Sequence, residues 1–341
     1  MIIEQPGCAT RATHLDDEVR LTDYLDRHLA NSLAAPSGVL AQAASHVLAA
    51  PGKLMRPRLL LDACLAAGGD PERALPAAAG TEYGHIASLI HDDIIDGDGE
   101  RRGQETLHRK YSLPTAILTG DLFIFQTFLS YTHCHERGIS AERVLTAINL
   151  LSRTCVEVCE GQALEASMAG QLDTPEEAYL QMIRLKSASV CRAASEIGAC
   201  LAEGPDEFIG ALRAYGEHLG MAFQIIDDVL AYDGVPSLLG KPQHSDLANG
   251  RVTIPIIYAI DAAGLAGRQQ ISALFWLART DPDTSYAQLV KLLVTTHALE
   301  RALQSAALCI EQAKRQLDYL PSSDARERLR ALADLVVTRD H

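Results

Sequence analysis

Apolar residues recur at spacings of three and four along almost the whole chain, whereas the apolar–polar alternation of a half-buried strand is hard to find. This pattern predicts an all-α protein. Long helices are expected at about residues 71–96, 141–168, 175–202 and 206–232, within a total of about ten to thirteen helices. The segment "YDGVPSLLGKPQHSDLANGR", at 232–251, is expected to be the one long interior loop.

Two of the expected helix starts carry local capping signals. Asp70 precedes Pro71, and an aspartate side chain can accept hydrogen bonds from the free amides of a first turn in which proline fits well. Thr174, Pro175 and Glu177 predict the second start. There Thr174 is the expected N-cap, and Glu177 is expected to reach back and complete a capping box.

The length and composition suit one large domain. The 341 residues are 48% apolar and only 5% aromatic, without an internal repeat or a linker. We expect a disordered tail at 1–14 and a single helical domain at 15–341. Nowhere do 18 apolar residues run together, and the N-terminus lacks the basic start and apolar core of a signal peptide. The sequence therefore predicts a cytoplasmic protein without a membrane span.

Charge and cysteine spacing exclude two further classes. With 30 basic and 44 acidic residues the net charge is −14, so nucleic acid would meet a repulsive field that no block of Lys and Arg offsets. Nucleic acid is therefore not an expected partner. The eight cysteines are scattered without the paired Cys-x-x-Cys spacing of a zinc or redox site.

An unusual concentration of acidic residues marks the stretch "LIHDDIIDGDGERR", at 89–102. If the helix that begins near Asp70 ends before Gly97, these carboxylates lie where the helix dipole is already negative. Asp92 and Asp96 are four residues apart and share one face, whereas Asp93 lies about 100° round the helix axis. A hard divalent cation such as Mg²⁺ would offset the repulsion. The alternative interpretation is a solvated acidic turn.

A second acidic pair, Asp227 and Asp228 in "FQIIDDVLAYDG", lies near the end of another expected helix. Two acidic helix ends indicate two walls of one metal site. Basic residues beside these acidic clusters favour a pocket for Mg²⁺ and diphosphate, because guanidinium and ammonium groups bind phosphate oxygens. These basic residues are Lys53, Arg56, Arg101, Arg102, Lys186, Lys241 and Arg251.

Several motifs occur together in one order: "GKLMRP", "HIASLIHDDIID", "RRG", "GDLFIFQTF", "CEGQALE", "RLKSAS", "FQIIDD" and "DLANGRVTIP". In this the chain resembles the trans-polyprenyl diphosphate synthases, over about residues 50–260 by motif. The resemblance implies a single large helical bundle of the isoprenoid synthase type with a central cavity. It also implies a homodimer. The implied reaction joins isopentenyl diphosphate to an allylic diphosphate and gives an all-trans polyprenyl diphosphate.

The resemblance also assigns roles to residues. About three Mg²⁺ ions, for which Mn²⁺ can substitute, are expected to bind Asp92, Asp93, Asp96, Asp227 and Asp228. The residues expected to bind the allylic diphosphate are Arg101, Lys186, Gln224 and Lys241, and Arg251 is a further expected substrate-binding residue. Those expected to hold isopentenyl diphosphate are Lys53, Arg56, His85 and Arg102. The carbonyl of Lys186 and the side chain of Ser187 would face the developing allylic cation.

The sequence departs from the family pattern in its second acidic motif. Ala231 stands where the family carries a third aspartate, and Asp233 lies about 240° further round the helix than Asp227, so it cannot replace that aspartate. We therefore expect a weakened third Mg²⁺ site with activity retained. Arg251 itself stands where the family usually has lysine, so it keeps the charge but not the geometry.

The length of the product is expected to depend on Ala87 and Ser88, which lie five and four residues before Asp92. Small side chains leave the pocket for the growing tail open, which predicts products of C20 or longer. The alternative is that a deeper floor sets the limit. The candidates for that floor are Phe123, Phe125 and Phe128.

Three other interpretations stay open at this point. A class I terpene cyclase shares the fold and the first acidic motif, but its Asn/Ser/Glu metal motif is not found here. A low-activity regulatory subunit of a heteromeric synthase would explain the missing aspartate at 231. A ferritin-like di-iron protein needs Glu-x-x-His pairs, a spacing that Glu82 with His85 and Glu105 with His108 do have.

Overall fold

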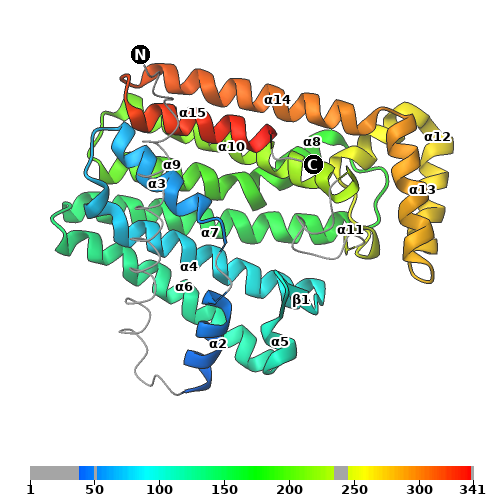
Figure 1. Cartoon of the computed structure of the whole chain (residues 1–341), viewed down its shortest axis with the longest axis horizontal. Helices are drawn as coiled ribbons and strands as arrows, with labels where there is room; N and C mark the ends of the chain where they lie inside the picture. Colours follow the sequence, from blue (N-terminus) through cyan, green and yellow to red (C-terminus); the bar gives the residue numbers. More distant parts are fainter. Residues whose placement is uncertain (1–37, 50–51, 234–244, 339–341) are drawn as a thin grey trace, which may run out of the picture. The chain divides into compact units, whose positions relative to one another are not determined.

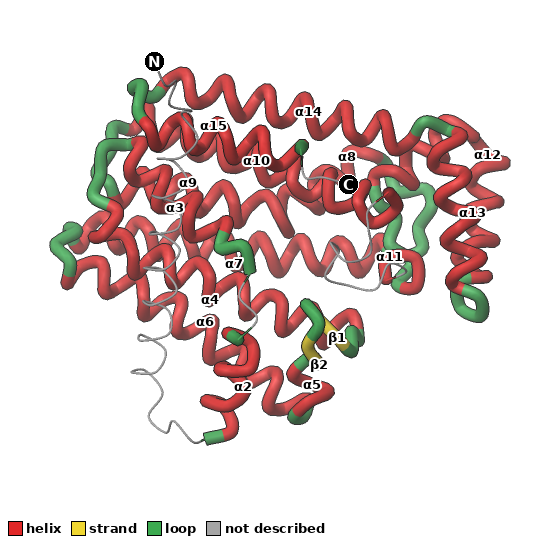
Figure 2. The backbone as a smooth tube through the Cα atoms, in the orientation of Figure 1, coloured by secondary structure: helices red, strands yellow, loops and turns green. Residues whose placement is uncertain are grey.

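A computed structural model describes residues 38–49, 52–233 and 245–338, and most of these residues are helical (Figure 1). The expected tail at 1–14 and most of the expected loop at 232–251 lie outside them. Within that loop, the described part contains a short helix, Ser245–Ala248. The tube in Figure 2 contains strand only at two short adjacent segments, which form an antiparallel hairpin. The prediction of an all-α fold is therefore confirmed.

The chain divides into two compact units, and each is described by itself. Unit 1 comprises residues 1–61 and 70–144, and unit 2 comprises 62–69 and 145–341. Whether the chain is one domain at 15–341 stays a prediction.

The elements of unit 1 are α2 (Val39–Leu48), α4 (Pro71–Asp96), β1 (Glu100–Arg101), β2 (Gln104–Glu105), α5 (Leu107–Lys110) and α6 (Leu113–Glu136), with the first part of α3 (Met55–Ala66) and the start of α7 (Ala141–Met168). The elements of unit 2 are the remainder of α3 and α7, then α8 (Glu176–Ile183), the π-helix η1 (Arg184–Ala188), α9 (Ser189–Leu201), α10 (Asp206–Asp233), α11 (Ser245–Ala248), α12 (Ile254–Leu277), α13 (Pro282–Thr295), α14 (Ala298–Gln316), the 3₁₀-helix η3 (Leu317–Tyr319) and α15 (Asp324–Val337).

The start of α4 is formed as its sequence predicts. Asp70 is the N-cap, and its carboxylate accepts a hydrogen bond from the amide of Glu72 at 3.0 Å, with Pro71 in the first turn. The helix ends at Gly97, whose φ of 69° lies in the left-handed region that glycine adopts without steric cost. The acidic cluster therefore does lie at the C-terminal end of a helix.

The predicted capping box before α8 is wrong. Pro175 is the N-cap residue, and no side chain caps this helix end. The hydroxyl of Thr174 instead donates to the carbonyl of Gln171 at 2.7 Å. Threonine offers its hydroxyl equally well to a carbonyl in a preceding turn, and that local bond is the one formed here.

The core of unit 1 is the contact between α4 and α6. A side chain at Gly80 would lie 2.9 Å from the ring of Tyr131, so the two helices approach closely at this glycine. Tyr83 packs against Phe123 with ring centroids 5.7 Å apart, and both side chains are fully buried. This packing fixes the acidic end of α4 relative to the rest of the unit.

α6 also has the length and hydropathy of a membrane span over its 24 residues. Its buried face packs on α4, as the core helix of a water-soluble domain would. The helix is therefore weak evidence for a membrane span, and the expected absence of one stays a prediction.

The core of unit 2 is built round α10, which packs against α9, α14 and α15. Gly216 of α10 lies so close to α9 that a side chain there would meet the backbone of Arg192 at 2.8 Å. The hydroxyl of buried Tyr215 donates to the carbonyl of Leu329 on α15 at 2.7 Å. α10 is thereby held from several sides. The acidic pair that it carries, Asp227 and Asp228, therefore occupies a fixed position within unit 2.

Candidate active site

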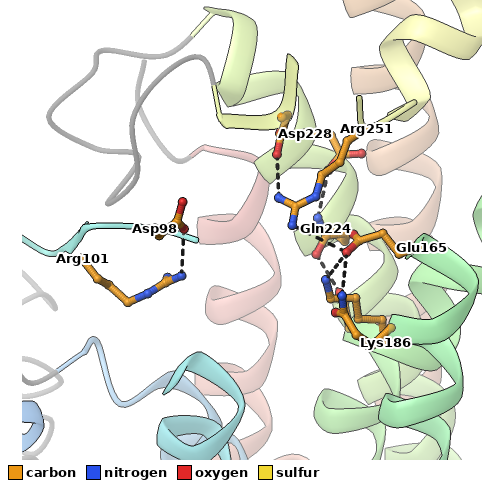
Figure 3. Close-up of polar contacts among 10 residues, drawn as sticks. Asp98, Arg101, Glu165, Lys186, Gln224, Asp228 and Arg251 are labelled. Atoms are coloured by element: carbon orange, nitrogen blue, oxygen red, sulfur yellow. Dashed lines mark hydrogen bonds and ion pairs between the residues drawn. The ribbon is translucent and has the colours of Figure 1, made fainter. Parts of the chain in front are cut away.

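At the end of α4, the carboxylates differ in their surroundings. Asp92 and Asp96 lie one turn apart and are partly exposed, whereas Asp93 is only 7% exposed. The Nε of Arg101 lies 2.5 Å from Asp93, and its Nη2 lies 3.7 Å from Asp98 (Figure 3). Asp93 therefore positions the guanidinium group of Arg101. The carboxylates of Asp92 and Asp96 share one face of the helix, which suits a metal ion.

A two-residue turn sets the position of Arg101. β1 and β2 are joined through Arg102 and Gly103, with φ of 52° and 74°, as in the hairpin turn whose two central residues both have positive φ. Arg102 is a non-glycine residue in this strained region, which costs about 1 kcal/mol or more. The hydroxyl of Thr106 closes the loop by donating to the carbonyl of Asp98 at 2.8 Å.

One of the four residues expected to hold isopentenyl diphosphate, Arg102, lines a pocket in unit 1. Gly52, Glu82 and Arg102 line it, and a side chain at Gly52 would lie 2.8 Å from the guanidinium of Arg102. Burial lowers the pKa of His85 well below its ordinary value, and Arg56 and Arg102 lower it further. His85 is therefore neutral at pH 7. The positive charge of the neighbouring arginines suits an anion such as diphosphate.

Glu82 is a member of this group that sequence reasoning did not assign to the substrate pocket. It is 4% exposed, and burial raises its pKa, against the opposing effect of Arg56 and Arg102. Its carboxylate therefore interacts with two of the cations expected to hold the acceptor. Its position three residues before His85 was the available signal.

In unit 2, Lys186 and Ser187 lie on the π-helix η1, between α8 and α9. Two glycines allow neighbouring helices to touch this segment directly. A side chain at Gly161 of α7 would lie 2.7 Å from the Cα of Lys186, and one at Gly220 of α10 would lie 2.6 Å from the Cα of Ala188. π-Helical segments are rare and often occur at functional sites. Here both expected substrate-binding residues are held on such a segment.

Glu165 connects two of the expected diphosphate-binding cations (Figure 3). Its Oε2 lies 2.6 Å from the Nζ of Lys186 and 3.7 Å from the Nη2 of Arg251. Arg251 also forms an ion pair with Asp246 at 2.9 Å. Sequence reasoning missed Glu165, although it lies within the motif "CEGQALE". The side chain holds two cations together where a diphosphate is expected.

A chain of hydrogen bonds runs from Ser187, on η1, to Asp228 of the second acidic pair. The hydroxyl of Ser187 donates to Oε1 of Gln224 at 2.7 Å, and Nε2 of Gln224 donates to Asp228 at 2.9 Å. The other carboxylate oxygen of Asp228 accepts from the hydroxyl of Tyr179. Burial raises the pKa of Asp228 to about 7, against these two hydrogen bonds. Asp227, next to it, is partly exposed.

Ala231 occupies the position at which the family pattern has the third aspartate of the second acidic motif. This alanine is partly exposed one turn after Asp227, and its carbonyl accepts a hydrogen bond from Tyr286 at 2.8 Å. No carboxylate therefore stands at the position that the family pattern expects. The side chain of Asp233 and all of Lys241 lie outside the described part of the chain.

The family model for polyprenyl synthetases matches residues 37–293. The chain is 37% identical to a short chain isoprenyl diphosphate synthase of Methanothermobacter thermautotrophicus over 302 residues, which are 89% of this chain and 91% of the relative. It is 35% identical to a geranylfarnesyl diphosphate synthase of Aeropyrum pernix, over 92% of this chain and 99% of the relative. Its fold matches a polyprenyl synthase of Caulobacter crescentus, complexed with calcium and isoprenyl diphosphate, at a TM-score of 0.87, with 30% identity and 99% of each chain covered.

The chain belongs to the polyprenyl synthetase family. It is therefore a prenyltransferase with the isoprenoid synthase fold. The ferritin-like interpretation is wrong. Glu105 lies in the strand β2 rather than on a helix with His108, so the second Glu-x-x-His pair is not formed.

The carboxylates present fit a divalent ion in the manner of a polyprenyl synthetase. Among the residues that the structure describes, no three His, Cys, Asp or Glu side chains converge to hold an ion by themselves. Mg²⁺ commonly takes one or two carboxylates and completes its octahedron with water and substrate phosphate oxygens. The partly exposed pair Asp92 and Asp96 suits that arrangement.

Two sets of residues are candidates for limiting product length in this polyprenyl synthetase, and their surroundings differ. Ala87 is 2% exposed, and the hydroxyl of Ser88 donates to the carbonyl of His85 at 2.8 Å. Phe123 is buried against Tyr83, whereas Phe125 is 70% exposed. Phe125 is therefore the weakest candidate for a deeper floor within unit 1.

Gly161→Ala is expected to lower kcat and to destabilise the protein by about 1–3 kcal/mol, because the new methyl group must displace the backbone at Lys186. Gly210→Ala, in α10, is the matched control, since no atom lies within 4 Å of the added group. The control is expected to keep kcat and to gain about 0.5–1 kcal/mol from helix propensity. Thermal unfolding and steady-state kinetics measure both. Equal kinetics in the two variants would show that the contact at Gly161 does not position η1.

Proposed function

We propose that the chain joins isopentenyl diphosphate to an allylic diphosphate and makes all-trans polyprenyl diphosphates of C20 or longer. The observation that carries this proposal is the proximity of Arg56 and Arg102 to His85, with Arg102 also lining a pocket, because a cyclase that uses a single diphosphate needs no such acceptor site. The similarity to a geranylfarnesyl diphosphate synthase and the small side chains at Ala87 and Ser88 support the product length.

The roles proposed for unit 1 follow from its charges. Lys53, Arg56 and Arg102 bind the diphosphate of the acceptor, and neutral His85 donates a hydrogen bond to it. The bound acceptor is thereby held in place for attack, which makes the step effectively unimolecular. Arg101, positioned by Asp93, stabilises negative charge on the allylic diphosphate as the carbon–oxygen bond breaks.

The roles proposed for unit 2 concern the allylic substrate. Lys186, Arg251, Lys241 and Gln224 bind its diphosphate. The carbonyl of Lys186 and the hydroxyl oxygen of Ser187 face the allylic carbon as positive charge develops there. The proton lost after carbon–carbon bond formation passes to the released diphosphate, so no protein base is required.

We propose Mg²⁺ as the metal, with Asp92 and Asp96 as direct protein ligands in unit 1 and Asp227 as a direct protein ligand in unit 2. Bound Mg²⁺ supplies Lewis-acid stabilisation of the charge that develops on the leaving diphosphate. The calcium in the structure of the Caulobacter crescentus relative supports the use of a divalent ion. Asp93 and Asp228 support these ligands through their own buried contacts. Three ions per site, with Mn²⁺ as a substitute, remain a prediction.

We propose a homodimer in which α6 contributes to the interface. Leu118, Phe125 and Leu129 are 54%, 70% and 45% exposed and follow one face of this helix at spacings of seven and four. An exposed apolar stripe of this kind marks an interaction surface. The mass of the purified protein in solution, measured by light scattering, tests the proposal, and a monomeric mass would contradict it. A cytoplasmic location stays a prediction from the sequence.

The purified chain, given Mg²⁺, isopentenyl diphosphate and an allylic diphosphate, is expected to release prenyl diphosphates of C20 or longer, identified by mass spectrometry. Hydrocarbon formed from the allylic substrate alone would instead indicate a terpene cyclase. No turnover by the chain alone, with turnover restored by a partner subunit, would indicate the regulatory role. Several allylic primers should be compared, because the preferred primer determines where elongation begins.

Ala87→Phe is expected to shorten the product by at least one isoprene unit, because a ring at this position blocks the tail pocket. Ala87→Val is the smaller control substitution and should shift the product distribution less. Chromatography of the dephosphorylated products measures both. An unchanged product length in the phenylalanine variant would favour the deeper floor over Ala87.

Ala231→Asp is expected to lower the Mg²⁺ concentration needed for half-maximal turnover, because it restores a carboxylate one turn from Asp227. Wild type should be active but require more Mg²⁺. A titration of turnover against free Mg²⁺ measures the difference, with Ala231→Asn as the uncharged control of similar shape. Superimposable titrations for wild type and Ala231→Asp would show that the missing carboxylate is irrelevant.

A further inference from the structure

The hydrogen-bond chain between Tyr179 and Ser187 has a direction. Asp228 accepts a hydrogen bond from the NH₂ of Gln224 at 2.9 Å, so the side-chain amide of Gln224 turns its donor end toward Asp228. Its carbonyl oxygen then faces Ser187, which must donate its only proton. The Ser187 oxygen is left with lone pairs and no proton for any group on its other side.

Tyr179 holds the other end of this chain. Its side chain is 1% exposed, and its hydroxyl donates to the second carboxylate oxygen of Asp228. Burial and the charge of Asp228 raise the pKa of Tyr179 well above its ordinary value, so the hydroxyl keeps its proton and acts as a donor. Asp228 therefore accepts a hydrogen bond from each of its two neighbours.

We propose that Tyr179 is a positioning residue that acts through Asp228 and Gln224 to present an unprotonated face of the Ser187 oxygen to the developing allylic cation. The inference rests on the proposed function and adds to it a residue that touches neither substrate nor metal. A lone pair directed at the cation stabilises positive charge, whereas a hydroxyl proton directed there would oppose it. The effect arises only as charge develops, so it belongs to the transition state.

Tyr179→Phe removes only the hydroxyl and is expected to lower kcat about 10- to 100-fold, the range for one lost hydrogen bond to a charged group. The KM for isopentenyl diphosphate should not change. Tyr215→Phe is the matched control, because it removes another buried tyrosine hydroxyl of unit 2, bonded only to the carbonyl of Leu329. The control is expected to lose stability to a similar extent but to keep kcat. Equal kcat in the two variants overturns the proposal.

A double-mutant cycle separates positioning from a general loss of stability. If Tyr179 acts through Ser187, then Tyr179→Phe should have little further effect on kcat in a Ser187→Ala background. Losses that multiply independently overturn the proposal. Asp228→Asn provides a second test that conserves shape, because an amide can donate to Gln224 and reverse the chain. It should lower kcat at saturating Mg²⁺, and a wild-type kcat in this variant overturns the proposal.

A readout without turnover keeps this inference distinct from the proposed function. The side-chain amide resonance of Gln224, identified by its loss in Gln224→Leu, should shift in Tyr179→Phe and stay in place in Tyr215→Phe. A resonance that does not move in Tyr179→Phe overturns the inference, whatever the activity. An inactive wild type in which the resonance moves as expected would instead contradict the proposed function.

Discussion

Repulsion between carboxylates at the end of a helix is the constraint on which the site depends. α4 ends immediately after Asp92, Asp93 and Asp96, where the unpaired carbonyl groups already make the helix end negative. The protein offsets part of this cost internally, because Asp93 is buried in an ion pair with Arg101. Asp228 of α10 is treated differently, since two neutral donors satisfy it. In both motifs the second aspartate is buried and bonded, and the first is left partly exposed.

Because one aspartate of each pair is buried and bonded and the other is partly exposed, the two adjacent carboxylates can have different roles. A buried carboxylate that is fully hydrogen-bonded fixes the geometry of its helix end and of the groups bonded to it. A partly exposed neighbour keeps oxygen atoms accessible to a cation and to water. Asp93 thereby positions Arg101, and Asp228 positions Gln224. The pairing of an accessible with a buried aspartate places a proposed metal ligand beside a residue that we propose to bind the substrate.

The fold could be predicted wherever local signals determine it. The bounds expected for the helices at 71–96 and 141–168 agree with α4 and α7, because caps, proline and glycine positions act over a few residues. The helix expected at 175–202 was predicted without its π-helical interruption. That interruption depends on close contact with Gly161 and Gly220, which are distant in sequence, and no local pattern reports such contacts.

For the site too, local motifs predict some residues, whereas residues with partners distant in sequence are missed. Motif spacing predicted the aspartates and the cations of the candidate site, but not Glu165 or Tyr179, whose partners lie 21 and 49 residues away along the chain. Glu165 has a further consequence for substrate binding. Because Lys186 is already paired with it at 2.6 Å, an incoming diphosphate exchanges one anionic partner for another rather than meeting a bare ammonium group. The desolvation cost of that ammonium group is met on folding, so a diphosphate gains mainly from its higher charge and its additional oxygen atoms.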